Sequence, residues 1–182
     1  MKRQLGFNLV ELIIVVAIVA ILLGIGVPSY RYVTNSYRIS SEVNNLLGDL
    51  MYARAEAVKE GGGVTVCVSN GAACLGNTAW QNGWVVFSNP LNAANPPAGS
   101  ILRSQAAFAG TPTADSFVAS NGVDTVTYNR EGFATTAAGF PSTTITLQDP
   151  THNATWTRCL LISAQGTLTT ETPANSPSGT CL

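Results

Sequence analysis

The hydrophobic and polar positions divide the chain into three stretches with different periods. Residues 7–27 are almost wholly apolar, and Glu11 is the single charged residue among them. As a helix they would be about 31 Å long, which matches the roughly 30 Å hydrocarbon core of a bilayer. Lys2 and Arg3 come before them, so the positive-inside rule predicts that this end stays in the cytoplasm and that everything after residue 27 lies outside.

Residues 28–60 repeat their apolar positions at the three- and four-residue spacing of an amphipathic helix. The residues predicted to form its packed face are Ile39, Val43, Leu46, Leu47, Leu50, Met51, Ala57 and Val58. Pro28, together with Gly24 and Gly26, predicts a kink or a locally melted stretch where the two helical segments meet. The glycines at 61–63 predict the end of the helix.

Residues 61–182 consist of short β-type runs separated by turn sequences such as Asn70-Gly71 and Asn121-Gly122. The predicted strands are 64–69, 84–88, 100–103, 123–129, 143–147, 159–164 and 166–170. The fold class predicted from these patterns is α+β. A long N-terminal helix, first transmembrane and then amphipathic, packs on a mainly antiparallel β-sheet head that is long enough for one core.

Glu11 is the most informative residue of the apolar segment. A carboxylate in the middle of a bilayer costs roughly 2.5–3.5 kcal/mol, so an acid within a membrane span indicates a function. A cleaved secretory signal peptide and a plain single-span anchor are the other interpretations. The segment is longer than the usual apolar region of a signal peptide, carries an acid, and lacks a clear small-x-small cleavage site before Pro28.

The residues Gly6-Phe7-Asn8-Leu9-Val10-Glu11-Leu12 resemble the class III signal of type IV pilins and type II secretion pseudopilins. The resemblance implies that residues 1–6 are a leader, that prepilin peptidase cuts after Gly6, and that Phe7 is then N-methylated. Glu11 is the acid at the fifth mature position. It would pair with the amine of a neighbouring subunit and fix the axial register during filament growth. Asn8 stands where threonine is common, and Pro28 matches the family's helix-kinking proline.

Four cysteines follow the apolar segment and would face an oxidising compartment, which favours disulfides. Three connectivities are possible. Cys67 and Cys74 flank a turn-rich segment, and a bond between Cys159 and Cys181 would hold the loose tail against the sheet. We therefore predict the pairs Cys67–Cys74 and Cys159–Cys181. The alternative is zinc bound by cysteines and His152, although a close Cys-x-x-Cys pair is missing.

Further matches make the resemblance more specific, to the minor pseudopilins of the GspH/FimT family. They are residues 53–58, Val64-Thr65-Val66-Cys67 with Cys74, residues 80–87, residues 159–163 and Gly166. Trp80 and Trp84 are interpreted as core residues, and Arg54 and Glu56 as part of a solvated helix face. The family implies a structural subunit of the tip or initiating complex of a type IV pilus or type II secretion pseudopilus.

The resemblance also implies partners and a location. The partners are prepilin peptidase, other minor and major pilins or pseudopilins, and the inner-membrane assembly platform. The location is the bacterial inner membrane, crossed once with the head in the periplasm, and afterwards the pilus or pseudopilus. Both machines share the motifs described above, so the sequence does not separate them.

DNA binding during natural transformation is the alternative function. Some family members carry a basic cluster just after the glycine equivalent to Gly166, whereas residues 167–171 contain no lysine or arginine here. Only three arginines stand against five acidic residues after Gly63, which does not favour phosphate binding. His152 is the single histidine and no nucleophile or phosphate-binding motif accompanies it, so we expect no enzyme activity, cofactor or metal.

Overall fold

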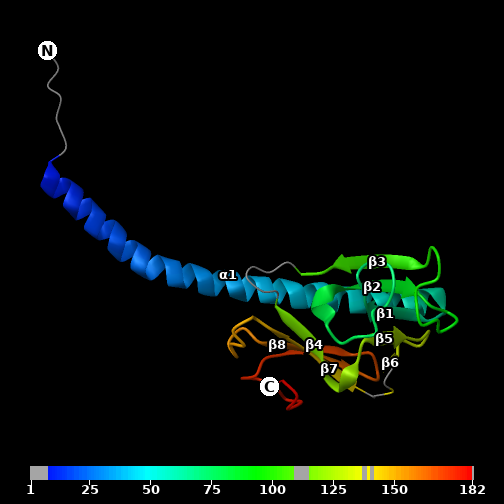
Figure 1. The fold of residues 1–182 in the computed structure, drawn as a ribbon. Helices are drawn as coiled ribbons and strands as arrows, with labels where there is room; N and C mark the ends of the chain where they lie inside the picture. Colours follow the sequence, from blue (N-terminus) through cyan, green and yellow to red (C-terminus); the bar gives the residue numbers. More distant parts are fainter. Residues whose placement is uncertain (1–7, 109–114, 137–138, 140–141, 182) are drawn as a thin grey trace. The chain divides into compact units, whose positions relative to one another are not determined.

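The computed structural model describes residues 8–108, 115–136, 139 and 142–181. The chain forms two compact units, residues 1–37 and residues 38–182. Helix α1, Leu9–Glu60, supplies the described part of the first unit and the first element of the second (Figure 1). It continues without interruption through Gly24, Gly26 and Pro28, so the predicted melted stretch is absent. Of the two predicted alternatives, a kink or a melted stretch, only a bend within the continuous helix is compatible with the structure.

Helix α1 ends as the glycines predict. Gly61 has a φ of 67°, a left-handed conformation that costs little without a Cβ. The N–H of Gly62 donates to the carbonyl of Ala57 at 3.2 Å, the bond that closes a Schellman motif. This turn directs the chain out of the helix and straight into the first strand.

The second unit contains a five-stranded antiparallel sheet with the order β3-β2-β1-β5-β6. Its strands are β1 Val64–Val68, β2 Gly83–Ser88, β3 Ile101–Ala106, β5 Thr125–Tyr128 and β6 Ala134–Thr136. The central strand β1 is buried over its whole length. Its alternate residues therefore face two different packed layers.

A second antiparallel sheet has the order β4-β7-β8-β9. Its strands are β4 Ser116–Ala119, β7 Ser142–Gln148, β8 Arg158–Ser163 and β9 Leu168–Glu171. Two short 3-10 turns, η1 Trp80–Asn82 and η2 Ser120–Gly122, complete the unit. The α+β prediction is confirmed, but the chain has two sheets where one was predicted, and β4 and β6 were not predicted.

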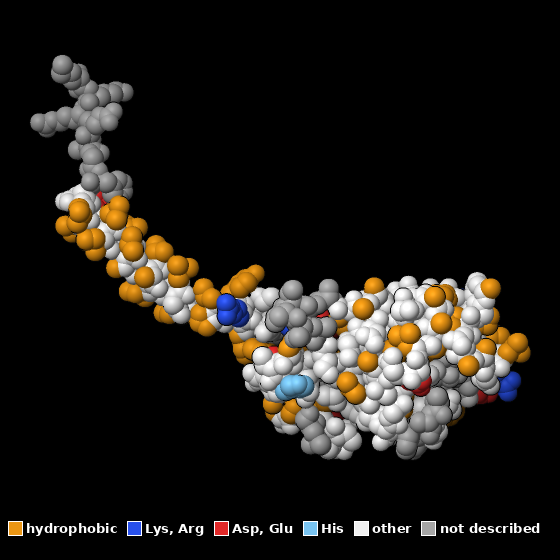
Figure 2. All heavy atoms as spheres, viewed as in Figure 1, with side chains coloured by type: hydrophobic (Ala, Val, Ile, Leu, Met, Phe, Trp, Pro, Cys, Tyr) orange, Lys and Arg blue, Asp and Glu red, His pale blue; other side chains and the backbone are white. Residues whose placement is uncertain are grey.

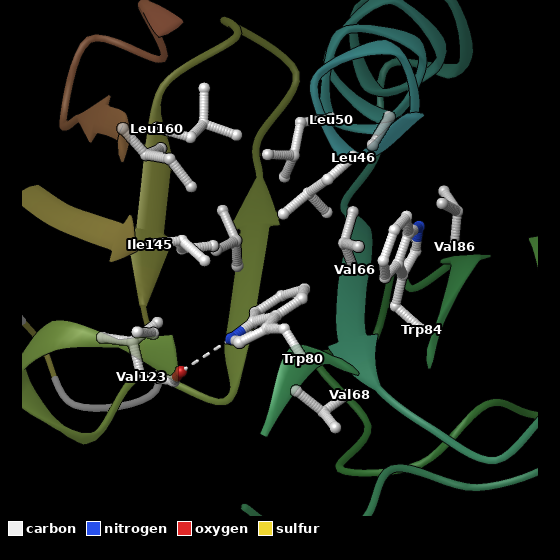
Figure 3. Close-up of a cluster of buried hydrophobic side chains, with 14 of the residues drawn as sticks. Leu46, Leu50, Val66, Val68, Trp80, Trp84, Val86, Val123, Ile145 and Leu160 are labelled. Atoms are coloured by element: carbon white, nitrogen blue, oxygen red, sulfur yellow. Dashed lines mark hydrogen bonds between the residues drawn. The ribbon is translucent and has the colours of Figure 1, made fainter. Parts of the chain in front are cut away.

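One hydrophobic core joins the helix to both sheets (Figure 3). Its members include Leu46 and Leu50 of α1, Val66, Val68 and Val86 of the first sheet, and Ile145 and Leu160 of the second. Trp80 and Trp84 are fully buried, which confirms their interpretation as core residues. Met51 and Val58 were predicted to lie on the packed face, but their side chains are 59% and 53% exposed. The packed stripe of α1 is therefore narrower than the apolar pattern indicated.

Candidate assembly site

Glu11, the acid of the apolar segment, lies at the beginning of α1. Asn8 caps the helix, because its Oδ1 accepts a hydrogen bond from the Val10 N–H at 3.3 Å. Glu11 follows in the first turn, where the positive end of the helix dipole favours a carboxylate. Gly6 and Phe7, the predicted cleavage and methylation residues, lie outside the described residues. Asn8 thus has a structural role that the pattern of the signal did not reveal.

The side chains between Leu9 and Val27 form an uncovered apolar surface within the first unit. Every one of these residues is exposed, Leu9 at 73% and Ile25 at 70% (Figure 2). By length and composition α1 is able to cross a membrane. A surface of this kind is stable only when lipid or other apolar helices cover it.

Within the second unit, Asp49 connects the helix to two neighbouring strands. Its carboxylate accepts hydrogen bonds from the Trp84 Nε1–H at 2.8 Å and from the Arg103 guanidinium at 3.0 Å. The Arg103 guanidinium also lies over the ring of Tyr52, 3.8 Å from its centroid. Because Trp84 is on β2 and Arg103 on the edge strand β3, one helical carboxylate positions that side of the sheet.

Arg54 connects the helix to turns of both sheets. Its Nε–H donates to the carbonyl of Gly132, between β5 and β6, and its Nη2–H donates to the carbonyl of Gln165, between β8 and β9, each at 3.0 Å. The interpretation of Arg54 as part of a solvated face is therefore wrong. Gly166 is required at this contact, because its φ is 74° and a Cβ there would lie 2.2 Å from the Gly132 oxygen.

A group of charged residues lies at the start of the second unit. The Arg38 guanidinium pairs with Asp115 at 2.8 Å, and the Asp115 side chain is only 3% exposed. Glu42, one helical turn from Arg38, is 8% exposed, and its Oε2 has no hydrogen-bond partner among the residues that the structure describes. Burial raises the pKa of Glu42 to about 7, the Asp115 carboxylate adds to this effect, and Arg38 partly offsets it.

Both predicted disulfides are present in the structure. Cys67 on β1 is bonded to Cys74, and Cys159 on β8 is bonded to Cys181. The first bond lies in a small second cluster with Val85 and Phe87. Since all four cysteines are used in disulfides, none supplies a thiolate for the zinc alternative.

Comparison with known proteins assigns the family. A model of the prokaryotic N-terminal methylation motif matches residues 1–27. The model of the type II transport protein GspH matches residues 42–166, which is more than half of the chain. The chain belongs to the GspH family. Members of the pilin and pseudopilin families are structural subunits, so the expectation of a non-enzymatic protein agrees with the assignment.

Solved structures support the same fold for this GspH family member. Two crystal forms of the type IV minor pilin FimU from Pseudomonas aeruginosa are similar to it. The first has a TM-score of 0.59 at 20% identity and covers 78% of this chain and 94% of FimU. The second has a TM-score of 0.52 at 18% identity, with coverage of 80% and 96%. No curated protein sequence matches the chain significantly.

Proposed function

We propose that this GspH family member is a minor pilin or pseudopilin that enters the tip or initiating complex of a type IV pilus or a type II secretion pseudopilus. The proposal rests on one observation, the presence of an N-terminal methylation motif and a GspH family head in the same chain. An N-terminal methylation motif begins an exposed apolar helix, and the same helix continues into a head of the GspH family. The fold shared with a minor pilin supports the same conclusion.

Processing is the first step of the proposed function. Prepilin peptidase would cut between Gly6 and Phe7 and methylate the new amino group of Phe7. The precursor would lie in the inner membrane with its head in the periplasm, consistent with the basic residues Lys2 and Arg3 before the apolar segment. The inner-membrane assembly platform and the other pilins or pseudopilins would then receive the subunit.

Glu11 is proposed to select the docking position. After cleavage the amine of Phe7 comes only four residues before Glu11 in the sequence, so each subunit carries both groups near the start of its apolar segment. A carboxylate that meets a neighbour's amine in an apolar environment is neutralised. A subunit docked out of register would leave a buried charge without its partner, which costs about 3–5 kcal/mol.

The cleavage is tested by mass spectrometry of the mature chain isolated from cells. A chain that begins at N-methylated Phe7 supports the proposal, and a chain that retains residues 1–6 contradicts it.

Assembly is tested with Glu11→Gln, which removes the charge and retains the shape. We expect this variant to be processed but to enter filaments poorly. Glu56→Gln is the matched control, because Glu56 is another acid of α1 and its ion pair in the described residues is with the exposed Lys59.

The structure does not favour the DNA-binding alternative. The arginines of the second unit already have partners in the described residues. Arg103 binds Asp49, Arg130 binds Glu131 at 2.7 Å, and Arg158 donates to the carbonyls of Thr155 and Thr157. A nucleic-acid site needs cations that are free to neutralise several phosphates. A gel shift with DNA at low salt would be the result that reopens this alternative.

A further inference from the structure

A polar cleft lies on the face of the first sheet that turns away from α1. Its volume is about 580 Å³, and its lining comes from β1, β5 and β6, from the loop after β2 and from the turn that contains Cys74. Val64 and Val66 of β1 pack in the core with the helix, so Thr65 between them lies on the opposite face and lines the cleft. A cleft of this volume is large enough for a small ligand.

Hydroxyl and amide groups dominate the lining of the cleft. Threonine and asparagine side chains supply most of it, and Asp124 is the only charged residue among the described residues that line it. Because no cation is present there, the lining does not favour an anion. Because those residues include no large apolar side chain, it does not favour an apolar ligand either. The composition favours a neutral ligand that makes many hydrogen bonds.

A chain of hydrogen bonds fixes which way the hydroxyl groups on the floor of the cleft point. Asn89 is buried, and its Nδ2–H donates to the Thr65 Oγ1 at 2.9 Å, so Thr65 is the acceptor at this contact. The Thr65 Oγ1 also lies 2.9 Å from the Thr127 Oγ1. Since Thr65 is only 1% exposed, the Thr127 oxygen is the acceptor that the described residues offer for its proton. Thr127 therefore keeps its own hydroxyl proton for a group inside the cleft.

Three other groups of the cleft have their roles fixed in a similar way. The Asn95 Oδ1 accepts a hydrogen bond from the Cys74 N–H at 3.1 Å, which leaves the Asn95 Nδ2–H groups to donate to a ligand. Thr135 donates its hydroxyl proton to the carbonyl of Thr127 at 3.3 Å, so the Thr135 Oγ1 remains an acceptor. The Asp124 Oδ1 accepts from the next threonine hydroxyl at 3.0 Å, and its Oδ2 is a second acceptor. The cleft thus presents both donors and acceptors.

A hydroxyl-rich ligand matches this mixture, because each hydroxyl group donates one hydrogen bond and accepts two. Thr127 and Thr135 stand opposite each other on neighbouring strands, which lie about 4.8 Å apart. Alternate equatorial hydroxyl groups of a pyranose ring have a similar separation, so one sugar ring can reach both threonines.

The walls of the cleft are held in place without a ligand. The Asn89 Oδ1 accepts the Ala93 N–H at 2.6 Å, which fixes the loop after β2, and the disulfide Cys67–Cys74 fixes the turn opposite. A site that is already ordered loses little conformational entropy when it binds.

We propose that this cleft binds a neutral saccharide of one or two rings. Thr127 and Asn95 donate hydrogen bonds to its hydroxyl groups. Thr135 and Asp124 accept hydrogen bonds from them. The described lining residues include no aromatic ring on which a sugar could stack, so we expect a millimolar Kd. The inference goes beyond the proposed function and does not depend on it, because the site belongs to the folded head alone.

Ligand-observed saturation-transfer NMR on the full chain tests the proposal. The chain is kept in a detergent without a sugar headgroup, because a maltoside would compete for the cleft. The probes are maltose and N,N′-diacetylchitobiose, each titrated to about 20 mM, well above a millimolar Kd. The two probes distinguish a plain glucan from a saccharide that carries N-acetyl groups.

Two variants remove single hydrogen-bonding groups of the cleft. Asn95→Asp removes the Nδ2–H donors and keeps an oxygen for the Cys74 N–H, and Thr135→Val removes an acceptor and keeps the branched shape. Each should raise the Kd about fivefold, the usual effect of one lost hydrogen bond. Asn153→Asp is the matched control, because the Asn153 Oδ1 also accepts a backbone N–H, from Thr155 at 3.0 Å, and Asn153 does not line the cleft.

Saturation transfer to either disaccharide that both cleft variants weaken, and that Asn153→Asp leaves unchanged, supports the proposal. The better-bound probe then identifies the kind of saccharide. No transfer to either probe at the highest concentration overturns the proposal. Binding that the cleft variants leave intact, or that the control weakens as much as they do, also overturns it. Each variant is first shown to melt at the wild-type temperature, so that a loss of binding is not a loss of fold.

Discussion

Replacing Glu42 by glutamine should stabilise the head at alkaline pH and leave it unchanged at acidic pH. Glu42 is buried beside Asp115, and within the described part of the chain one of its carboxyl oxygens has no hydrogen-bond partner. The folded chain therefore holds the proton of Glu42 more tightly than the unfolded chain does. Glutamine keeps the shape of the side chain and cannot acquire the charge that burial disfavours.

The size of the effect follows from the pKa of Glu42, which is about 7 in the folded chain against an ordinary 4.5. An acid with a raised pKa makes the folded state less stable as the pH rises between those two values, because the unfolded chain releases the proton first. At about 1.4 kcal/mol for each pKa unit, the loss for Glu42 reaches about 3 kcal/mol above pH 7. Below pH 4.5 this loss is absent.

Urea unfolding of the full chain in detergent, followed by tryptophan fluorescence, measures the free energy of unfolding at pH 4.5 and pH 8.5. We expect Glu42→Gln to match the wild type at pH 4.5 and to exceed it by up to about 3 kcal/mol at pH 8.5. Glu56→Gln controls for a general loss of negative charge, and an ion pair with a partner as exposed as Lys59 is worth at most about 1 kcal/mol. The reasoning is refuted if Glu42→Gln lowers stability at pH 8.5 or shifts it equally at both pH values.

Two further predictions concern the connection between the helix and the turns. Arg54→Ala should lower the free energy of unfolding by about 2–4 kcal/mol, because two carbonyls lose a charged donor, whereas Arg130→Ala should change it by less than about 1 kcal/mol. An equal effect of both variants in urea unfolding would contradict the bridging role. Gly166→Ala should lower the stability of the head more than Gly179→Ala. Both glycines have a positive φ, but only a Cβ at residue 166 would meet backbone, 2.2 Å from the Gly132 oxygen. Thermal unfolding of the two variants side by side measures the difference, and equal melting temperatures would disprove it.

The elements with a strong local pattern could be predicted from the sequence. The helix period, the Gly61 stop and seven of the strands are local features, and the structure has a strand at each of those seven places. Strands β4 and β6 were missed because their sequences, Ser-Phe-Val-Ala and Ala-Thr-Thr, do not alternate between polar and apolar residues. Their conformation is set by pairing with β7 and β5. The division into two sheets likewise depends on pairing between distant segments.

The polar contacts of the helix could not be predicted because their partners are far away in the sequence. Arg54 reads as a solvated cation when only the helix is considered, yet its acceptors are backbone carbonyls 78 and 111 residues away. Every residue has a backbone carbonyl, so the sequence does not indicate which carbonyl will accept a hydrogen bond from Arg54. Asp49 and Glu42 are ordinary helix acids until Trp84 of β2 and Asp115, which comes just before β4, are placed beside them. Glu11 differs, because its significance comes from its own apolar surroundings.

The way in which Arg54 contacts the head has a mechanical consequence. Its guanidinium donates to turns of two separate sheets, and the core beneath joins the same helix to both. Tension that arrives along α1 is therefore divided between the sheets in parallel. We therefore expect the two sheets to resist pulling together and the head to unfold under force in a single event.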